Sequence, residues 1–374
     1  AAGQTTTLSG GNSYAGDYQV LGDLVLTNGT YTLTPGTTFY VNGRATRIGA
    51  FGTPIRRVSG STITVGDKAT LVLDNATLTA SGSTTTCPMW RGVVVKGIGA
   101  GPGTTNRLVV QNGSAISHAL CALSLEDGSN GGTTAYVIER SAFAQNLTHV
   151  RDVAVHTAGT TSFIANCTFD SDPGQTRFPY EQAGGTQYFA YQALYLTPVG
   201  DFGSHAVEVT GNAINNAVYG IVNNEVDRAG VMIQNNVLNK IFQTGIWTVN
   251  NDTNTGTTIS VTSGNQVGLN GIFPANTDQI DPTATRYGIV REGRLAIPNL
   301  FVNNTVTGNT NPAFNNYQQI GLSISGPTSA SGNLLQNMNE GISATELSGS
   351  DIVDNQTSGC VNGFVVKNYI NGQS

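Results

Sequence analysis

The 374-residue chain carries 17 basic and 23 acidic side chains and a formal net charge of −6, and only 11% of its residues are charged. Its few basic residues form no stripe that could follow a phosphate backbone, which argues against a nucleic-acid partner. No apolar run approaches the roughly 20 residues that cross a bilayer, so membrane insertion is not expected. Hydrophobic residues make up 39% of the chain, enough for a substantial core.

Short strand-like runs fill the amino-terminal third, at 18–26, 29–36 and 70–78, and Asn-Gly, Pro-Gly and Asp-Asn corners separate them. We expect these runs to be the first rungs of a coil. Residues 1–16 are rich in Gly, Thr and Ser and offer no capping helix, so this terminal segment is a candidate for a role in assembly. The small residues at the start resemble those near a signal-peptidase cut, which favours secretion.

A Cys-Pro-Met-Trp-Arg-Gly-Val motif occupies residues 87–93, and a run ending in Gly-Ser-Ala-Ile-Ser-His-Ala follows at 113–119. This combination resembles secreted right-handed parallel β-helix repeat proteins of Bacteroidetes-type bacteria, in which a Cys-x-Met-Trp-x-Gly-Ile strand precedes a similar run. The resemblance implies a fold and a secreted location rather than a chemistry. Trp90 is either an anchor that fills the coil or a platform for a sugar, and we favour the anchor.

Four cysteines (Cys87, Cys121, Cys167 and Cys360) form no CxxC pair, which argues against a zinc ribbon and allows up to two disulfides. The first candidate pair is Cys87 with Cys121. The alternative is that the cysteines are small buried hydrophobic residues. We expect no metal and no cofactor.

Residues 149–156 hold the best catalytic candidates, which are weak. His149 and Arg151 share a face of an alternating strand, and together they could neutralise a uronate and remove its α-proton, as in a polysaccharide lyase. Solvated or packing side chains are the favoured alternative. No Asp-Asp followed by Gly-His-Gly, typical of polygalacturonase-like hydrolases, is present.

Two long excursions interrupt the pattern, at 170–191 and 278–294. The first contains weak carbohydrate-binding candidates whose rings could stack on sugars, although such aromatic loops also cover neighbouring rungs, which we favour: Phe178, Tyr180, Tyr188 and Phe189. Acids in this loop could serve a glycosidase. The second excursion has balanced charge, typical of a surface salt-bridge network.

From residue 207 onward one pattern recurs: an alternating strand, an Asn, and then, typically eight or nine positions after the Asn, a Gly followed by an aliphatic strand. Asn212 is followed by Gly220 and Asn236 by Gly245, and we assign Gly271 to the next copy. Successive Gly residues lie 25 and 26 residues apart, within the range of solenoid repeats. Such repeats are too short for a βαβ unit and pair only by stacking.

The sequence therefore predicts an all-β chain with a single domain over residues 1–374, a right-handed parallel β-helix with loop excursions. Asn suits one corner because it tolerates left-handed backbone and can form side-chain ladders, and Gly suits another because it accepts positive φ. A calcium site at the Asn residues is the alternative, but the acidic partners are missing.

The function that the sequence favours is an extracellular structural protein that stacks on itself head to tail, because residues 363–370 still read as strand and open strand edges invite pairing. The alternative is a carbohydrate-active enzyme, either a polysaccharide lyase or a glycosidase, or a carbohydrate-binding surface protein. We favour a protein that is not an enzyme. A flat Thr face for ice binding is disfavoured because the Thr residues come in runs rather than in a Thr-x-Thr array.

Overall fold

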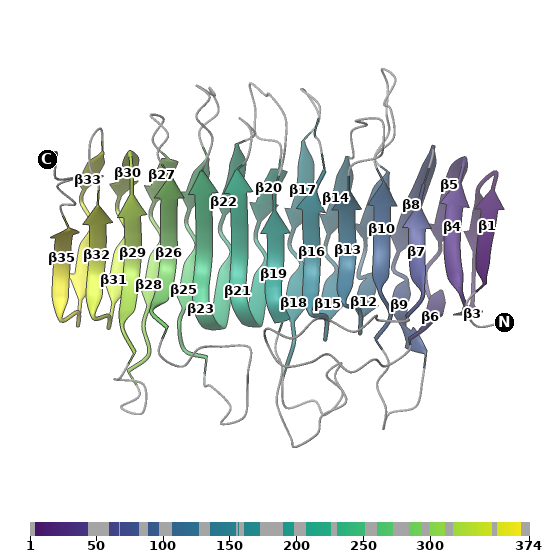
Figure 1. Cartoon of the computed structure of the whole chain (residues 1–374), viewed down its shortest axis with the longest axis horizontal. Helices are drawn as coiled ribbons and strands as arrows, with labels where there is room; N and C mark the ends of the chain where they lie inside the picture. The colour runs from purple at the N-terminus through teal and green to yellow at the C-terminus, as the bar shows by residue number, and fades with distance from the viewer. Residues whose placement is uncertain are drawn as a thin grey trace, which may run out of the picture.

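The computed structural model shows a right-handed parallel β-helix whose coils stack along one long axis, with the two termini at opposite ends (Figure 1). The structure describes residues 4–43, 60–66, 68–81, 89–96, 107–126, 135–154, 156, 161–172, 190–197, 207–225, 230–250, 260–271, 284–293, 299–310, 317–345 and 350–367. Every strand pairing within these ranges is parallel. They contain strands and turns but no helix, and hence no helix long and apolar enough to span a membrane.

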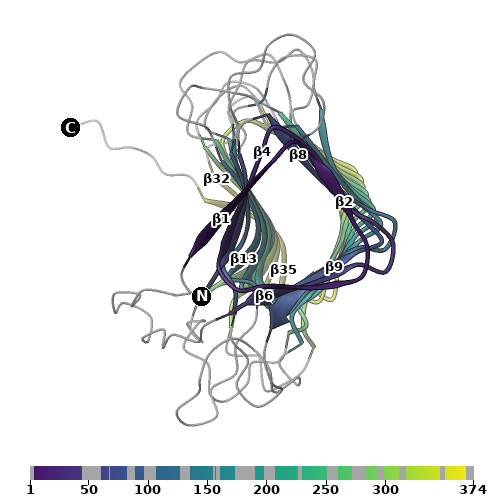
Figure 2. The same ribbon diagram turned by 90° about the vertical axis from the view of Figure 1, so that its right-hand side faces the viewer.

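Three parallel sheets form the walls of the coil around a closed interior (Figure 2). The first sheet has twelve strands: β2 (Asn12–Tyr14), β5 (Gly29–Leu33), β8 (Ala69–Asp74), β11 (Leu108–Gln111), β14 (Tyr136–Glu139), β17 (Ser162–Ala165), β20 (Val207–Thr210), β22 (Val231–Gln234), β24 (Val261–Ser263), β27 (Asn299–Val302), β30 (Thr328–Ser331) and β33 (Asp351–Val353).

The second sheet contains β3 (Asp17–Val20), β6 (Thr38–Asn42), β9 (Thr77–Ser81), β12 (Ala115–Ser117), β15 (Ala142–Ala144), β18 (Thr168–Asp170), β25 (Gln266–Gly268), β28 (Thr305–Thr307), β31 (Leu334–Gln336) and β34 (Gln356–Ser358). Between β18 and β25 this wall is continued by the first halves of β21 (Ala213–Glu225) and β23 (Val237–Asn250), which turn the corner into the third sheet.

The third sheet contains the second halves of β21 and β23 together with β1 (Thr5–Ser9), β4 (Asp23–Thr27), β7 (Thr62–Val65), β10 (Gly92–Lys96), β13 (Cys121–Glu126), β16 (Thr148–Val153), β19 (Ala190–Leu196), β26 (Arg286–Gly293), β29 (Gln319–Ser325), β32 (Glu340–Thr345) and β35 (Asn362–Lys367). The chain passes from the third sheet to the first, then to the second, and begins the next coil on the third.

The interior is filled by columns of aliphatic side chains, because strands in register place equivalent residues above one another. One column on the third sheet runs without a break through Leu123, Val150, Leu194, Ile221 and Ile246, all of them fully buried. Burial of each such side chain contributes about 1.5–3 kcal/mol relative to exposure. These columns hold the coils together across their whole width.

A ladder of buried Asn side chains lines the corner between the first and second sheets. Asn236 donates from its backbone N–H (3.0 Å) and from Nδ2 (2.9 Å) to Oδ1 of Asn265 on the next coil, and Asn265 Nδ2 donates to the Ile233 carbonyl at 2.9 Å. The same pattern connects six coils, through Asn212, Asn236, Asn265, Asn304, Asn333 and Asn355. The residue before each of them, not the ladder Asn itself, adopts the left-handed conformation, as at Asn235 with φ of 54°.

A column of Gly residues lies at the corner between the second and third sheets, as the repeat predicts, but for a different physical reason. Positive φ is not the cause, because these Gly residues do not adopt it. A Cβ on Gly245 would lie 2.5 Å from the Gly288 carbonyl oxygen and would also strike the Val267 side chain. The column is therefore required by the close approach of successive coils.

Two predictions about this region are wrong. The third-sheet strand after β23 begins at Arg286, so the Gly of that coil is Gly288, whereas Gly271 packs against the Phe242 ring outside the column. The predicted excursion at 278–294 consequently includes β26 (Arg286–Gly293), which is part of the coil. The short Gly-Ile pair occurs in both places, and the sequence alone does not distinguish them.

Replacing Asn265 by Ala is expected to lower the free energy of unfolding by about 2–5 kcal/mol, because two buried donors of Asn236 and the Ile233 carbonyl lose their partner. Urea unfolding followed by circular dichroism measures this loss. The matched control is Asn235→Gly at the exposed left-handed corner, where the change is expected to stay within about 1 kcal/mol. Equal losses in the two variants would contradict the ladder's role.

Candidate functional site

Aromatic side chains gather on the outer side of the third sheet, and we call this group the outer aromatic cluster: Tyr191, Tyr195, Tyr219, Phe242 and Trp247. Strand alternation directs Tyr195 outward, because its neighbours Leu194 and Leu196 are fully buried in the core. Trp247 is directed outward in the same way between Ile246 and Thr248. Tyr195 and Trp247 are half-buried.

The strand register places a charged side chain in line with this cluster. Arg151 pairs with Tyr195, Tyr195 with Val222, and Val222 with Trp247. Since adjacent strands lie about 4.8 Å apart, the line from Arg151 to Trp247 covers roughly 14 Å along the helix axis. The row therefore runs along the length of the solenoid.

Ring contacts hold the cluster together at the corner between the second and third sheets. The Tyr191 and Tyr219 rings meet edge to face, with their centroids 5.4 Å apart, and the Tyr219 and Trp247 centroids are 5.9 Å apart. Fully buried Val218 and Phe242 lie beneath them, separate from the main core. Burial, reinforced by Tyr191, raises the pKa of Tyr219 to about 12, so its hydroxyl stays protonated and neutral.

The Trp247 side chain presents only carbon to solvent. Its indole Nε1 is buried and meets no hydrogen-bond partner among the described residues, while the side chain as a whole is half-buried. All of its accessible surface is therefore apolar ring. Such a surface suits stacking against the apolar face of another ring.

The prediction that His149 and Arg151 share an outward face is wrong. His149 is fully buried, and its ring lies 5.6 Å from the Phe169 ring, centroid to centroid. Its Nδ1 lies 3.1 Å from Asn146 Nδ2 and its Nε2 lies 3.4 Å from Ser171 Oγ. Both His149 and its neighbour Val150 are buried, because β16 turns the corner between two sheets there and alternation fails.

Arg151 is exposed and points outward. Its Nη1 lies 3.6 Å from Glu126 Oε1 and donates to Ser124 Oγ at 3.4 Å. A lyase pair of His149 and Arg151 is therefore not assembled. Arg151, paired with Glu126, lies beside Tyr195 on the outer face.

A second group of polar side chains lies inside the coil. Tyr136 donates its hydroxyl to Asp152 Oδ2 at 2.7 Å, and His156 Nε2 lies 2.9 Å from the same oxygen. Ser162 Oγ lies 3.5 Å from His156 Nδ1, which completes a serine, histidine and aspartate series of the kind found in hydrolases. All four side chains are at most 3% exposed, so the group lies in the packed interior and not on a substrate-accessible surface.

The remaining sequence candidates divide into those the structure describes and those it does not. Five candidates lie outside the described residues: Phe178, Tyr180, Tyr188, Phe189 and Cys87.

Burial raises the pKa of Cys121 to about 12. Cys87 lies outside the described residues, so the Cys87–Cys121 disulfide stays a prediction. Trp90 is fully buried and donates Nε1–H to the Ser117 carbonyl at 2.8 Å, which confirms it as an anchor.

Two arginines from the second predicted excursion are interior residues, not members of a surface network. Arg286 is 1% exposed, lies 4.8 Å from the Tyr317 ring centroid, and has a pKa lowered to about 10 by burial. Arg291 is fully buried and donates to Thr328 Oγ1 at 3.0 Å. Both lie on β26, which pairs with β23 on one side and β29 on the other, and this place within the stacked coils explains their burial.

No protein-family model matches the chain, and no curated protein matches it in sequence. Among solved structures it is similar to the surface protein and adhesin PfbA of Streptococcus pneumoniae, at 10% identity and a TM-score of 0.44, over 97% of this chain and 91% of that one. It is also similar to a tailspike protein of E. coli bacteriophage HK620 in complex with a pentasaccharide, at 12% identity and a TM-score of 0.37, over 96% and 72%. The GH136 lacto-N-biosidase from Eubacterium ramulus is similar at 9% identity and a TM-score of 0.31, over 93% and 62%.

Burial of His149 predicts a specific loss of stability in acid. Its pKa falls from 6.5 to about 3 on folding, so between these values the unfolded chain binds a proton that the folded chain does not. The contribution of neutral His149 to the free energy of unfolding is present above pH 6.5. It falls as the pH drops below that value, by about 2 kcal/mol at pH 5.

The measurement compares wild type with His149→Gln by urea unfolding at pH 7.5 and pH 5. The advantage of wild type over the variant is expected to shrink by about 2 kcal/mol at the lower pH. Parallel pH profiles for the two proteins would show that His149 does not titrate in this way.

Proposed function

We propose that this protein is an extracellular or cell-surface β-helix that binds a polysaccharide along the outer face of its third sheet. The observation that carries the proposal is the outer aromatic cluster, in line with Arg151 and extending across successive coils. Pyranose rings have apolar faces that stack on aromatic rings, and an extended chain needs a row of such contacts. The repeating coils supply that row.

The polar groups beside the cluster fit the hydroxyl groups of a sugar. Gln192 pairs in register with Tyr219, and both side chains are half-buried, so an amide lies beside a ring on the outer face. Thr244, the next residue in this register, is buried. Arg151 places a guanidinium, paired with Glu126 and 44% exposed, at one end of the row, where it could also donate hydrogen bonds to a sugar. This composition suits a binding face with both apolar and hydrogen-bonding contacts.

The described carboxylates on this face favour binding over hydrolysis. Glu126 on β13 and Glu292 on β26 are five strands apart, which corresponds to about 24 Å. A third described carboxylate of this sheet, Glu340 on β32, is paired with Lys367 Nζ at 3.1 Å. The paired acids of glycosidases lie about 5–9.5 Å apart. A role as a binder or adhesin is therefore the better fit to the described part of this face.

An extracellular location is supported by the sequence. The motif at 87–93 resembles that of secreted β-helix proteins of Bacteroidetes-type bacteria, and a composition low in charged residues and rich in hydroxyl and amide groups suits a secreted protein.

Head-to-tail assembly into a fibre or surface layer is a second candidate function. The observation that favours it is the position of the exposed large hydrophobic side chains. Of the eight such side chains among the described residues, Tyr18, Leu21 and Tyr40 lie on the first two coils, Val353, Val361, Phe364 and Val366 lie on the last coil, and Phe163 alone lies between. Assembly and polysaccharide binding use different surfaces and are compatible.

Loss of either ring is expected to weaken polysaccharide binding. Trp247→Ala and Tyr195→Ala should each raise Kd about tenfold, equivalent to roughly 1.4 kcal/mol. The probes are β-glucan, xylan, mannan, pectate and alginate, first in a pull-down and then by isothermal titration calorimetry on those that bind. The matched control is Phe163→Ala, an exposed ring on the first sheet, which should leave Kd unchanged. Binding that survives both ring losses would refute the site, as would no binding to any probe.

A further inference from the structure

Rings and smaller side chains alternate from coil to coil along the outer side of the third sheet. One line of this pattern, which we call the outer row, consists of Tyr195, Val222, Trp247 and Val290, in register on β19, β21, β23 and β26. Both rings of the outer row are half-buried, and both Val side chains are buried. A ring therefore recurs in this row at every second coil.

A second line, the corner row, lies three positions earlier on the same strands and has the opposite phase. It consists of Gln192, Tyr219, Thr244 and Tyr287. Tyr219 and Tyr287 are half-buried, whereas Thr244 between them is buried. The Tyr219 and Trp247 centroids are 5.9 Å apart, so rings of the two rows meet. Each of the four coils thus contributes one ring to the two rows, on alternate sides of a common line.

The strand spacing determines the repeat of this pattern. Adjacent strands lie about 4.8 Å apart, so Tyr195 and Trp247, like Tyr219 and Tyr287, are separated by roughly 10 Å along the helix axis. A ligand that fits must be straight, must turn an apolar face toward the rings, and must repeat over two coils.

A chain of β-1,4-linked pyranose sugars meets these three conditions. Each sugar is turned over relative to the one before it, so the chain is a flat ribbon and the same ring face recurs at every second sugar. That disaccharide repeat is close in length to two strand spacings. Glucose chains linked α-1,4 or β-1,3 curve into helices and do not stay in line with the rings.

The described charges around the two rows favour a neutral chain. Arg151 precedes Tyr195 in the outer row, and its Nη1 lies 3.6 Å from Glu126 Oε1. Glu292, two positions beyond Val290 on β26, is exposed. An acidic chain would therefore meet a guanidinium that is already paired at one end of the rows and a carboxylate at the other.

We infer that this face binds a neutral β-1,4-linked glycan as a straight ribbon along the helix axis, with about one sugar on each of the four coils. The inference rests on the polysaccharide binding proposed above and specifies its ligand. Hydroxyl groups project sideways from both edges of such a ribbon. Gln192 on the corner side and Asn224, two positions beyond Val222, are half-buried amides that lie along these edges.

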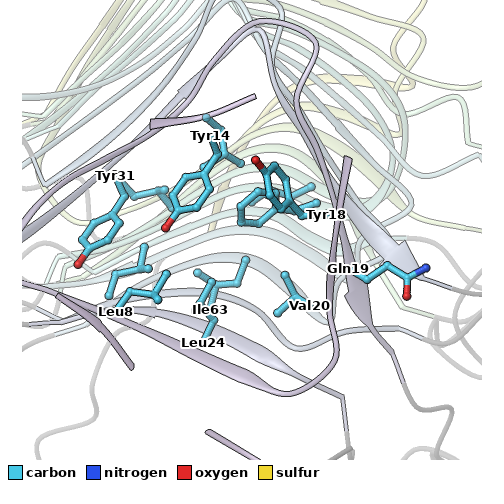
Figure 3. Close-up of a pocket in the computed structure, with 13 residues that line it drawn as sticks. Leu8, Tyr14, Tyr18, Gln19, Val20, Leu24, Tyr31 and Ile63 are labelled. Atoms are coloured by element: carbon cyan, nitrogen blue, oxygen red, sulfur yellow. The ribbon is translucent and has the colours of Figure 1, made fainter. Parts of the chain in front are cut away.

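A group of rings near the amino-terminal end of the coil has a different arrangement. Tyr14, Tyr18 and Phe39 pack edge to face or tilted, with centroids 5.3–5.6 Å apart, around an apolar cavity of about 150 Å³ (Figure 3). These rings enclose a compact space and do not form a line along the helix axis. Tyr18 is 39% exposed and therefore provides a control for ring loss away from the two rows.

The test compares hexasaccharides of different linkage by isothermal titration calorimetry on wild type. The β-1,4-linked probes are cellohexaose, xylohexaose, mannohexaose and chitohexaose, and the comparison probes are maltohexaose (α-1,4) and laminarihexaose (β-1,3). At least one β-1,4-linked probe is expected to bind about tenfold more tightly than both comparison probes. A β-1,4-linked mannuronate hexamer, which is straight but acidic, is expected to bind more weakly than the best neutral probe.

Tyr287 lies outside the outer aromatic cluster and tests the alternation itself. Tyr287→Ala is expected to raise Kd for the best hexamer about threefold or more, because one of four rings is lost, whereas Tyr18→Ala should leave Kd unchanged. Circular dichroism checks that both variants fold. The comparison of linkages uses wild type alone, so it stands even if a variant does not fold.

Three results would overturn the inference: equal or tighter binding of a comparison probe, tighter binding of the mannuronate hexamer, or an unchanged Kd in folded Tyr287→Ala. Binding of a polysaccharide without binding of any hexamer would also overturn it. In each of these cases, binding that still depends on Trp247 would leave the proposed polysaccharide site intact. Absence of binding to every hexamer and every polysaccharide would refute both proposals.

Discussion

Parallel hydrogen bonds between successive coils determine where every side chain of this protein lies. Since the strands stay in register, a residue type that recurs once per coil forms a column along the helix axis. Aliphatic columns fill the interior, the Asn ladder satisfies buried amides at one corner, and the Gly column lets coils approach at another. The same register aligns Tyr195 and Trp247 on the outer face, two coils apart with Val222 between them, so the fold also builds an elongated surface.

The same register determines which polar side chains are buried inside the coil and which can contact a ligand. His149, Asp152 and His156 are titratable groups, but they point inward and are enclosed by stacked coils, where they contribute to packing and hydrogen bonding. Outward positions of the third sheet are the places where side chains can meet a ligand, and the described residues there include aromatic rings, amides, Arg151 and the carboxylates of Glu126 and Glu292. A long chain of sugars matches such a surface better than a compact substrate does.

Much of the fold was predictable from the sequence, whereas most of the site was not. The spacing from Asn to Gly, eight or nine positions in four of the coils, predicts stacked parallel coils because both residue types answer to backbone constraints within one coil. Strand alternation fails for His149 because β16 turns a corner there. Gly271 and Gly288 are each followed by Ile, so the sequence alone does not show that Gly288 is the one in the column. Tyr195 and Trp247 come into line only through register across strands that are distant in sequence, and loops of variable length hide that register.

The central claim is that a polysaccharide lies on the outer aromatic cluster, and intrinsic tryptophan fluorescence tests it directly. The chain has two tryptophans, and Trp90 is sealed in the core, so a ligand-dependent change reports Trp247. Titration of the protein with a bound polysaccharide should give a saturable emission change and protect Trp247 from acrylamide. Unchanged emission and unchanged quenching at saturation would place the polysaccharide elsewhere and contradict the account.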